Sequence, residues 1–196
     1  MSKLVPSNKI EGIKALGAEV RLIGANQDEA LLEANRLSIE EGMTYISPFD
    51  NIDVIAGQGT LGLEIHRQIP ELNFAFVPLS GGGLICGVAK ALKGLNQNLK
   101  VIGVSMDRGA AMYEAQKAGK PIFVKEEESL ADALTGGIGL DNKYTFQLTK
   151  QLVDEIVLVS EKEIADGIHY AYWHESQIVE GAGAVAIASL LNKKFK

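Results

Sequence analysis

Residues 77–87, VPLSGGGLICG, are the stretch whose composition most clearly suggests chemistry. An apolar run leads to Ser80, three glycines follow, and a helical pattern begins at Leu84. Amide groups at a helix N-terminus have no intrahelical acceptor and lie at the positive end of the helix dipole. Glycines remove the Cβ atoms that would hold an anion away from those amides. The loop therefore predicts a phosphate site, to which each hydrogen bond would contribute about 1.5–3 kcal/mol.

Other kinds of loop share this pattern. A nucleoside triphosphate loop ends in Gly-Lys-Ser/Thr, whereas a valine follows Gly87, which disfavours that class. The spacing Gly81-x-Gly83-x-x-Cys86 nearly fits the G-x-G-x-x-G/A fingerprint of dinucleotide sites. A dinucleotide site is therefore an alternative, with Asp107 as the ribose contact. A further alternative is that the glycines only allow a helix to pack closely on a sheet.

The elements that must position this loop follow from the hydrophobic pattern, in which apolar runs alternate with stretches of helical period. Strands are expected at 18–24, 43–47, 73–79, 100–106 and 155–160, and helices at 28–42, 53–69, 84–95, 109–119, 161–175 and 180–191. The alternation predicts an α/β fold with three layers, a mostly parallel sheet covered by helices on both faces. The break at Pro48 predicts two lobes, a small α/β lobe at 1–50 and a larger one at 51–196.

Composition excludes several classes of protein. The chain has 196 residues, 46% of them hydrophobic, and a net charge of −6, which argues against nucleic acid or an anionic membrane as a partner. A single cysteine excludes a disulfide framework and fits a reducing compartment. No apolar run approaches the length of a membrane span. A cytoplasmic protein is expected.

Five stretches together resemble the threonine dehydratase and serine racemase family of fold-type II pyridoxal-phosphate enzymes. Their order and spacing match over essentially the whole chain. Residues 4–22 and 136–146 are further similar to the dehydratase branch associated with ectoine and hydroxyectoine breakdown. The five stretches are VIAGQGTLGLEI (54–65), VPLSGGGLICGVAKALK (77–93), VIGV (101–104), SLADAL (129–134) and VEGAGAVAIASLL (179–191).

The resemblance implies a fold like that of the tryptophan synthase β subunit, present in part, with 51–196 as the cofactor-binding lobe. It implies pyridoxal 5'-phosphate as the cofactor. Glu180 would lie beside the cofactor ring, although an acid at that position would also stabilise the helix dipole. The phosphate would be held by the backbone of Ser80, Gly81, Gly82, Gly83 and Leu84.

The Schiff-base lysine of the family stands in a Ser-Phe-Lys motif, and no lysine of this chain has that context. The lysine forms the imine with the cofactor and acts as base. We therefore expect the 196 residues to be the middle-to-late part of a longer enzyme and to be inactive alone, with no catalytic residue of their own. The lysines considered are Lys9, Lys14, Lys90 and Lys93.

The activity that the resemblance implies is that of a lyase. A small hydroxy amino acid such as threonine or serine would be converted to a 2-oxo acid and ammonia, because the water lost in the elimination is taken up again when the resulting imine is hydrolysed. A homodimer is expected. Alternatives are a racemase of the same family, a nucleotide-binding oxidoreductase domain and a non-catalytic binding module. No metal is expected, because Ser105 stands where cation-binding members have a glutamate, and Gly109 and Ala111 offer no ligand nearby.

Three other residues invite chemistry but favour structural roles. His169 and His174 are five residues apart, not the four that would place two ligands on one helix face. Cys86 follows the glycine loop, where a small buried residue would let the helix approach the sheet.

Overall fold

The computed structural model describes residues 1–195, and Lys196, the last residue of the predicted larger lobe, lies outside them. Backbone contacts divide the chain into two compact units, Met1–Ile46 and Ser47–Lys196. The sequence-based boundary was placed after residue 50. Each unit is described by itself.

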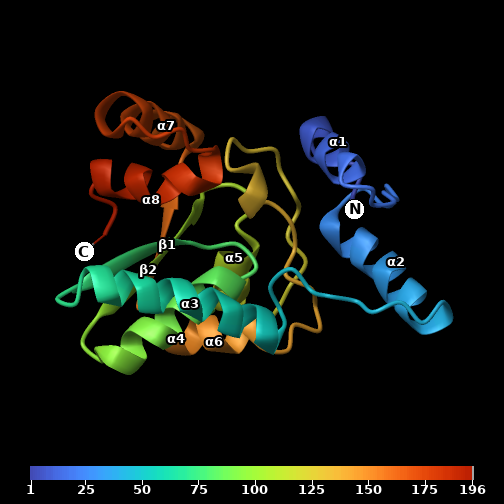
Figure 1. Ribbon diagram of the computed structural model, residues 1–196, viewed down its shortest axis with the longest axis horizontal. Helices are drawn as coiled ribbons and strands as arrows, with labels where there is room; N and C mark the ends of the chain where they lie inside the picture. The colour runs from blue at the N-terminus through green and yellow to red at the C-terminus, as the bar shows by residue number, and fades with distance from the viewer. Residues whose placement is uncertain (196) are drawn as a thin grey trace. The chain divides into compact units, whose positions relative to one another are not determined.

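The first unit, in blue in Figure 1, contains α1 (Ser7–Ala15) and α2 (Gln27–Glu40). The side chain of Asn26 caps α2 by accepting the amide of Glu29 at 2.9 Å. Arg36 then joins Glu33 and Glu40 on the exposed face of this helix.

The strands predicted at 18–24 and 43–47 are wrong, because neither segment forms a regular strand. A strand requires a ladder of backbone partners. Residues 21–24 have only short pairing with residues 1–3, as in the bond from the Ile23 amide to the Met1 carbonyl at 2.8 Å. Residues 43–47 have no ladder within the described part of the chain.

The second unit is built on a parallel three-stranded sheet in the order β1-β2-β3. Val77 of β1 pairs with Gly103 of β2, which pairs in turn with Ile156 of β3. The carboxyl ends of all three strands therefore meet at one edge, where ligands of open α/β sheets bind. The strands are β1 (Phe74–Pro78), β2 (Lys100–Met106) and β3 (Glu155–Val159).

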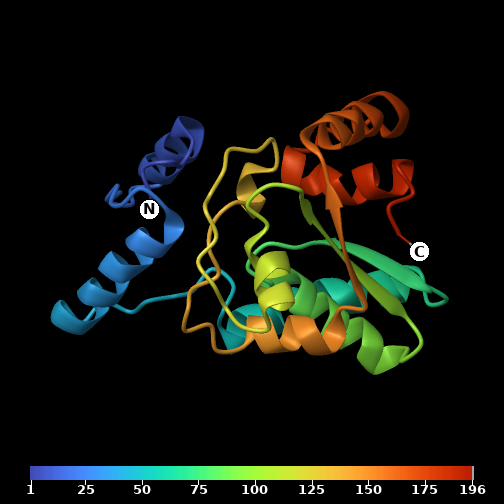
Figure 2. The ribbon, with the colours of Figure 1, turned by 180° about the vertical axis from the view of Figure 1, so that it is seen from behind.

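Helices cover both faces of this sheet, which confirms the predicted three-layer α/β fold (Figures 1 and 2). The helices α3, α4 and α6 lie on one face, and α7 and α8 lie on the other. The bounds are α3 (Ile52–Gln68), α4 (Gly83–Leu95), α5 (Ala111–Ala118), the 3₁₀ turn η1 (Asp132–Leu134), α6 (Thr145–Leu152), α7 (Glu161–Glu175) and α8 (Gly181–Leu191).

Two hydrophobic cores result, one on each face of the sheet. Val101 faces the core made with α3, α4 and α5, whereas Ile102 and Val104 face the core made with α7 and α8. All residues of β2 from Val101 onward are buried, as expected for the central strand of a parallel sheet.

Glycines allow α3 and α4 to pack closely. A methyl group at Gly62 would lie 2.9 Å from the Val88 carbonyl oxygen, and one at Gly87 would overlap the backbone of α3. Gly57 and Gly59 also lie inside α3, but a methyl group at Gly57 would meet no atom within 4 Å and one at Gly59 would make only ordinary contact, with the Gly87 carbonyl oxygen at 3.4 Å.

Candidate functional site

The glycine loop follows β1 directly and leads into α4. The amide of Leu79 donates to the Val104 carbonyl at 2.7 Å and so completes the pairing of the first two strands. Gly82 has φ +93°, a conformation that favours glycine, and it is the N-cap of α4. The first helical bond runs from the Cys86 amide to the Gly82 carbonyl at 3.0 Å.

The backbone amides of residues 80–85 form a set of available donors. Within residues 1–195, none of them donates a hydrogen bond. They lie at the positive end of α4, a helix of 13 residues. The donor set thus fits a phosphate group, because oxyanions are held by unpaired amides at a helix N-terminus.

Packing also requires the glycines. A methyl group at Gly81 would overlap the ring of Phe49, and one at Gly83 would lie 2.8 Å from the Phe49 Cα atom. On the other side, a methyl group at Gly82 would lie 3.1 Å from Thr149 Oγ1 of α6. These glycines therefore allow close packing against Phe49 and α6, and this packing leaves the loop amides without a hydrogen-bond acceptor among the described residues.

Asp50 joins the two segments that enclose the loop. Its carboxylate accepts the amides of Lys143 at 2.6 Å, Tyr144 at 2.8 Å and Thr145 at 2.9 Å. These amides lie at the start of α6, where the N-cap residue Tyr144 makes no side-chain cap and Asn142 Oδ1 accepts the next amide, that of Phe146, at 2.8 Å. Sequence reasoning treated Pro48-Phe49-Asp50 only as a break, because no local spacing announces a partner more than 90 residues away.

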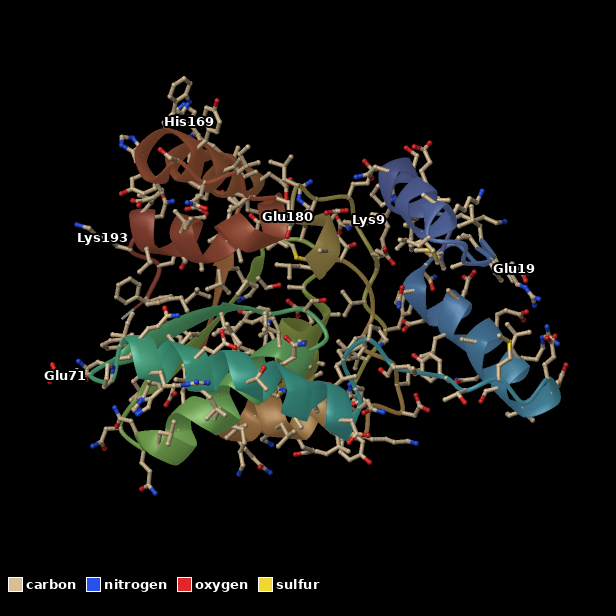
Figure 3. All side chains as sticks on the ribbon, in the orientation of Figure 1. Lys9, Glu19, Glu71, His169, Glu180 and Lys193 are labelled. Atoms are coloured by element: carbon tan, nitrogen blue, oxygen red, sulfur yellow. The ribbon has the colours of Figure 1, made fainter. Side chains whose placement is uncertain are left out.

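Glu180 is the N-cap of α8 (Figure 3). Its carboxylate accepts the amides of Ala182 at 2.8 Å and Gly183 at 3.0 Å. The acid therefore does stabilise the start of the helix, one of the two roles considered for it. No hydrogen bond links it to residues 80–84 in the described part of the chain.

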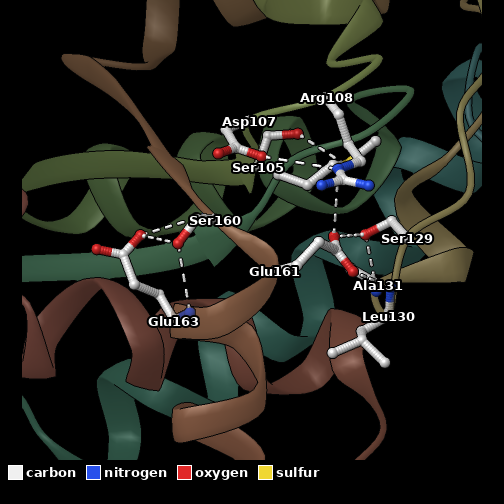
Figure 4. Close-up of polar contacts among 10 residues, drawn as sticks. Ser105, Asp107, Arg108, Ser129, Leu130, Ala131, Ser160, Glu161 and Glu163 are labelled. Carbon is white, nitrogen blue, oxygen red and sulfur yellow. Dashed lines mark hydrogen bonds and ion pairs between the residues drawn. The ribbon is translucent and has the colours of Figure 1, made fainter.

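A polar network at the same edge of the sheet positions the start of α8 (Figure 4). Glu161, the first residue of α7, accepts the Ser129 hydroxyl at 2.6 Å and the Leu130 amide at 2.8 Å. Arg108 lies 3.9 Å from the same carboxylate. Because a methyl group at Gly181 would overlap the Leu130 backbone, this network fixes the segment that contacts α8 next to Glu180.

The end of β2 offers few metal ligands. Ser105 is buried, with its hydroxyl 3.5 Å from Met106 Sδ. The Asp107 carboxylate oxygen Oδ1 lies 4.0 Å from Arg108 Nε. Residues 1–195 contain no group of three or more histidine, cysteine or acidic side chains placed to hold a metal ion.

The histidines and the cysteine have structural surroundings. His169 lies beside Trp173, and His174 stacks on Tyr170 with ring centroids 4.7 Å apart. Burial raises the pKa of the Cys86 thiol to about 11 despite a hydrogen bond with Thr149 that lowers it, so the thiolate is disfavoured at neutral pH.

A fold of this kind, with a glycine loop opening a helix after the first strand, matches a known class. The model of the pyridoxal-phosphate-dependent enzyme family matches residues 1–196. The chain therefore belongs to this family, and the expected cofactor, pyridoxal 5'-phosphate, is that of the family. The fold is the expected fold type II, present in part.

Two curated relatives and two solved structures show the similarity more closely. "Putative threonine dehydratase" of Sinorhizobium fredii is 55% identical over 99% of this chain, and L-threonine ammonia-lyase of Thermotoga maritima is 40% identical over 98%. Maize serine racemase matches 100% of the chain at 30% identity with a TM-score of 0.88. Processed threonine deaminase isoform 2 of Solanum lycopersicum matches 96% at 39% identity with a TM-score of 0.83.

The chain spans about half the length of these relatives. It covers 58% of the S. fredii protein, 48% of the T. maritima protein, 59% of the maize chain and 54% of the Solanum chain. Among residues 1–195, no helix combines the length and the apolar character needed to cross a membrane.

Proposed function

We propose that the loop of residues 80–84 binds the phosphate of pyridoxal 5'-phosphate, and that Glu180 lies beside the cofactor ring. The observation that carries the proposal is the set of amides at the start of α4 that have no acceptor within the described residues. The Ser80 hydroxyl adds a further donor, and the helix dipole adds favourable charge. No lysine is required for this grip.

The bound cofactor supplies an electron sink that stabilises a carbanion next to an amino group. The residues of this chain hold and orient it. The α4 dipole and the loop amides fix the phosphate end, while hydrogen bonds within α8 hold the Glu180 carboxylate in one place. Phe49 packs against the loop at Gly81 and Gly83.

For the whole protein we propose a dehydratase that converts a small hydroxy amino acid, such as threonine or serine, to a 2-oxo acid and ammonia. The names of the two curated relatives support this reaction. Racemisation is the second candidate, supported by the likeness to maize serine racemase at a TM-score of 0.88. The similarity of residues 4–22 and 136–146 supports the hydroxyectoine branch, and a cytoplasmic homodimer completes the proposal.

The 196 residues contain no lysine in a Ser-Phe-Lys context, so we propose that they do not catalyse alone. Of the predicted small lobe, residues 1–50, we propose that the first unit, Met1–Ile46, forms part of that lobe. The purified chain, supplied with pyridoxal 5'-phosphate and threonine or serine, should release no ammonia and no 2-oxo acid. Release of either product above the rate of free cofactor would contradict this.

The phosphate grip is tested separately by binding. Dissociation constants of the chain for pyridoxal 5'-phosphate and for pyridoxal differ only through the phosphate. We expect pyridoxal to bind at least about tenfold more weakly, equivalent to about 1.4 kcal/mol. Equal constants would remove the proposed role of the loop.

A further inference from the structure

We propose that Asp50 is a positioning residue for the glycine loop and thereby sets the affinity for the cofactor phosphate. The inference rests on the proposed function of residues 80–84 and adds a residue that does not touch the phosphate. Asp50 acts through two neighbours, Phe49 on one side of the loop and α6 on the other.

The first step is the attachment of Asp50 to α6. Oδ2 accepts the Lys143 amide at 2.6 Å, and Oδ1 accepts the amides of Tyr144 and Thr145 at 2.8 and 2.9 Å. A carboxylate on the first amides of a helix also interacts favourably with its dipole. A distant acid thus provides the cap that Tyr144 does not.

The second step is the rigidity of the segment that carries Asp50. The buried Ser47 hydroxyl accepts the amides of Phe49 at 3.4 Å and Asp50 at 3.0 Å. One residue further on, the Asn51 side chain caps α3 by accepting the amides of Asp53 and Val54. The segment on each side of Asp50 is therefore held in place. The hydrogen bonds of Asp50 then fix the position of the start of α6 relative to this segment.

The third step is the enclosure of the loop between those elements. Phe49 occupies the space where Cβ atoms of Gly81 and Gly83 would lie. From the α6 side, Thr145 Cβ and Thr149 Oγ1 would lie 3.0 and 3.1 Å from a Cβ atom on Gly82. The direction of the loop amides thus depends on the separation of Phe49 and α6, which Asp50 sets.

The test compares Asp50→Asn with Asp154→Asn. Asp154 also accepts three hydrogen bonds, from Lys93, Lys100 and the Val101 amide, but it lies at the opposite edge of the sheet. The same isosteric change thus removes one charge from a three-donor carboxylate in each variant. In Asp50→Asn, one carboxylate oxygen becomes an NH₂ group. That group is a donor and cannot accept the backbone amide that the oxygen accepted.

The readout is the ratio of the dissociation constants for pyridoxal and for pyridoxal 5'-phosphate, which isolates the contribution of the phosphate. We expect Asp50→Asn to lower this ratio by about fivefold to tenfold and Asp154→Asn to leave it unchanged. An unchanged ratio for Asp50→Asn, or an equal fall in both variants, would overturn the positioning role.

Two outcomes separate this inference from the proposal beneath it. A ratio of one in the unaltered chain would mean that the loop does not bind phosphate, and both would fail together. A large ratio that survives Asp50→Asn would leave the loop function intact and overturn the inference alone. If Asp50→Asn does not fold, Phe49→Leu decides, because losing the ring from Gly81 must lower the ratio if the enclosure matters.

Discussion

At the scale of single residues, the glycines of this chain differ in what they are for. Gly181 lies against the Leu130 backbone at the start of α8, where a Cβ atom has no room. Gly183, two residues later in the same turn, has only ordinary contacts, the nearest being Val179 Cβ at 3.7 Å. Helix propensity favours alanine at both positions, so the surroundings of each glycine decide whether a change to alanine stabilises or destabilises the protein.

This pair gives a matched prediction. Gly181→Ala should lower the free energy of unfolding by about 2 kcal/mol, because backbone must move to admit the methyl group. Gly183→Ala should be neutral or stabilise by up to about 1 kcal/mol. Urea unfolding of the two variants measures both values. Equal changes in the free energy of unfolding would show that the Leu130 backbone does not exclude a Cβ atom at position 181.

Asp154 links stability to pH. Partial burial would raise the pKa of this carboxyl, but hydrogen bonds from Lys93, the Val101 amide and Lys100 outweigh it and lower the pKa to about 2. A carboxyl whose pKa is lower in the folded state stabilises the protein above its unfolded pKa, and this stabilisation is lost as pH falls through the folded pKa.

The unaltered chain should therefore lose about 1–2 kcal/mol more stability between pH 5 and pH 2 than Asp154→Asn does. Urea midpoints at several pH values provide the comparison. Parallel curves for the two proteins would show that the three hydrogen bonds do not favour the ionised form.

At the scale of elements, contacts between distant segments hold the edge of the sheet where the strands end. Asp50 accepts backbone amides at the start of α6. Glu161 accepts the Leu130 amide in the segment before η1 (Figure 4). Both acids stand beside a helix start and satisfy amides from elsewhere in the chain. The loops at this edge therefore owe their order to a few carboxylates rather than to regular structure of their own.

Glu161→Ala should release the segment 129–131. Amide hydrogen exchange there should accelerate by about fivefold or more, because the Leu130 amide and the Ser129 hydroxyl lose their acceptor. Lys162→Ala, at the exposed neighbouring position, is the control and should leave exchange in this segment unchanged. Unchanged amide hydrogen exchange at residues 129–131 in Glu161→Ala would show that Glu161 does not hold this segment.

The elements also show what the sequence could predict. The strand at 100–106 and the helix at 161–175 were predicted with the bounds observed, because the strand is a short apolar run and the helix begins at a capping box formed by Ser160 and Glu163. The helix α6 was missed, since three of the amides at its start are held by the distant Asp50 and only the Phe146 amide by a local side chain, that of Asn142. Segments 18–24 and 43–47 have strand-like composition, but a strand depends on partners that local pattern does not reveal.

At the scale of the whole molecule, the parallel sheet brings separate loops to one edge. Residues 80–84 follow β1, Asp107 follows β2, and Ser160 follows β3. The loop itself could be predicted because strand, glycines and helix are consecutive in sequence. The contacts of Phe49, Asp50 and Glu161 could not, because they join residues far apart in the chain.

The central claim is that amides at the start of α4 bind the phosphate group of the cofactor. Amide proton–nitrogen correlation spectra of the chain, titrated with pyridoxal 5'-phosphate and separately with pyridoxal, test it residue by residue. We predict that the phosphorylated compound shifts the amides of Gly81, Gly82 and Gly83 and that pyridoxal does not. Unmoved glycine amides at saturating pyridoxal 5'-phosphate would contradict the claim.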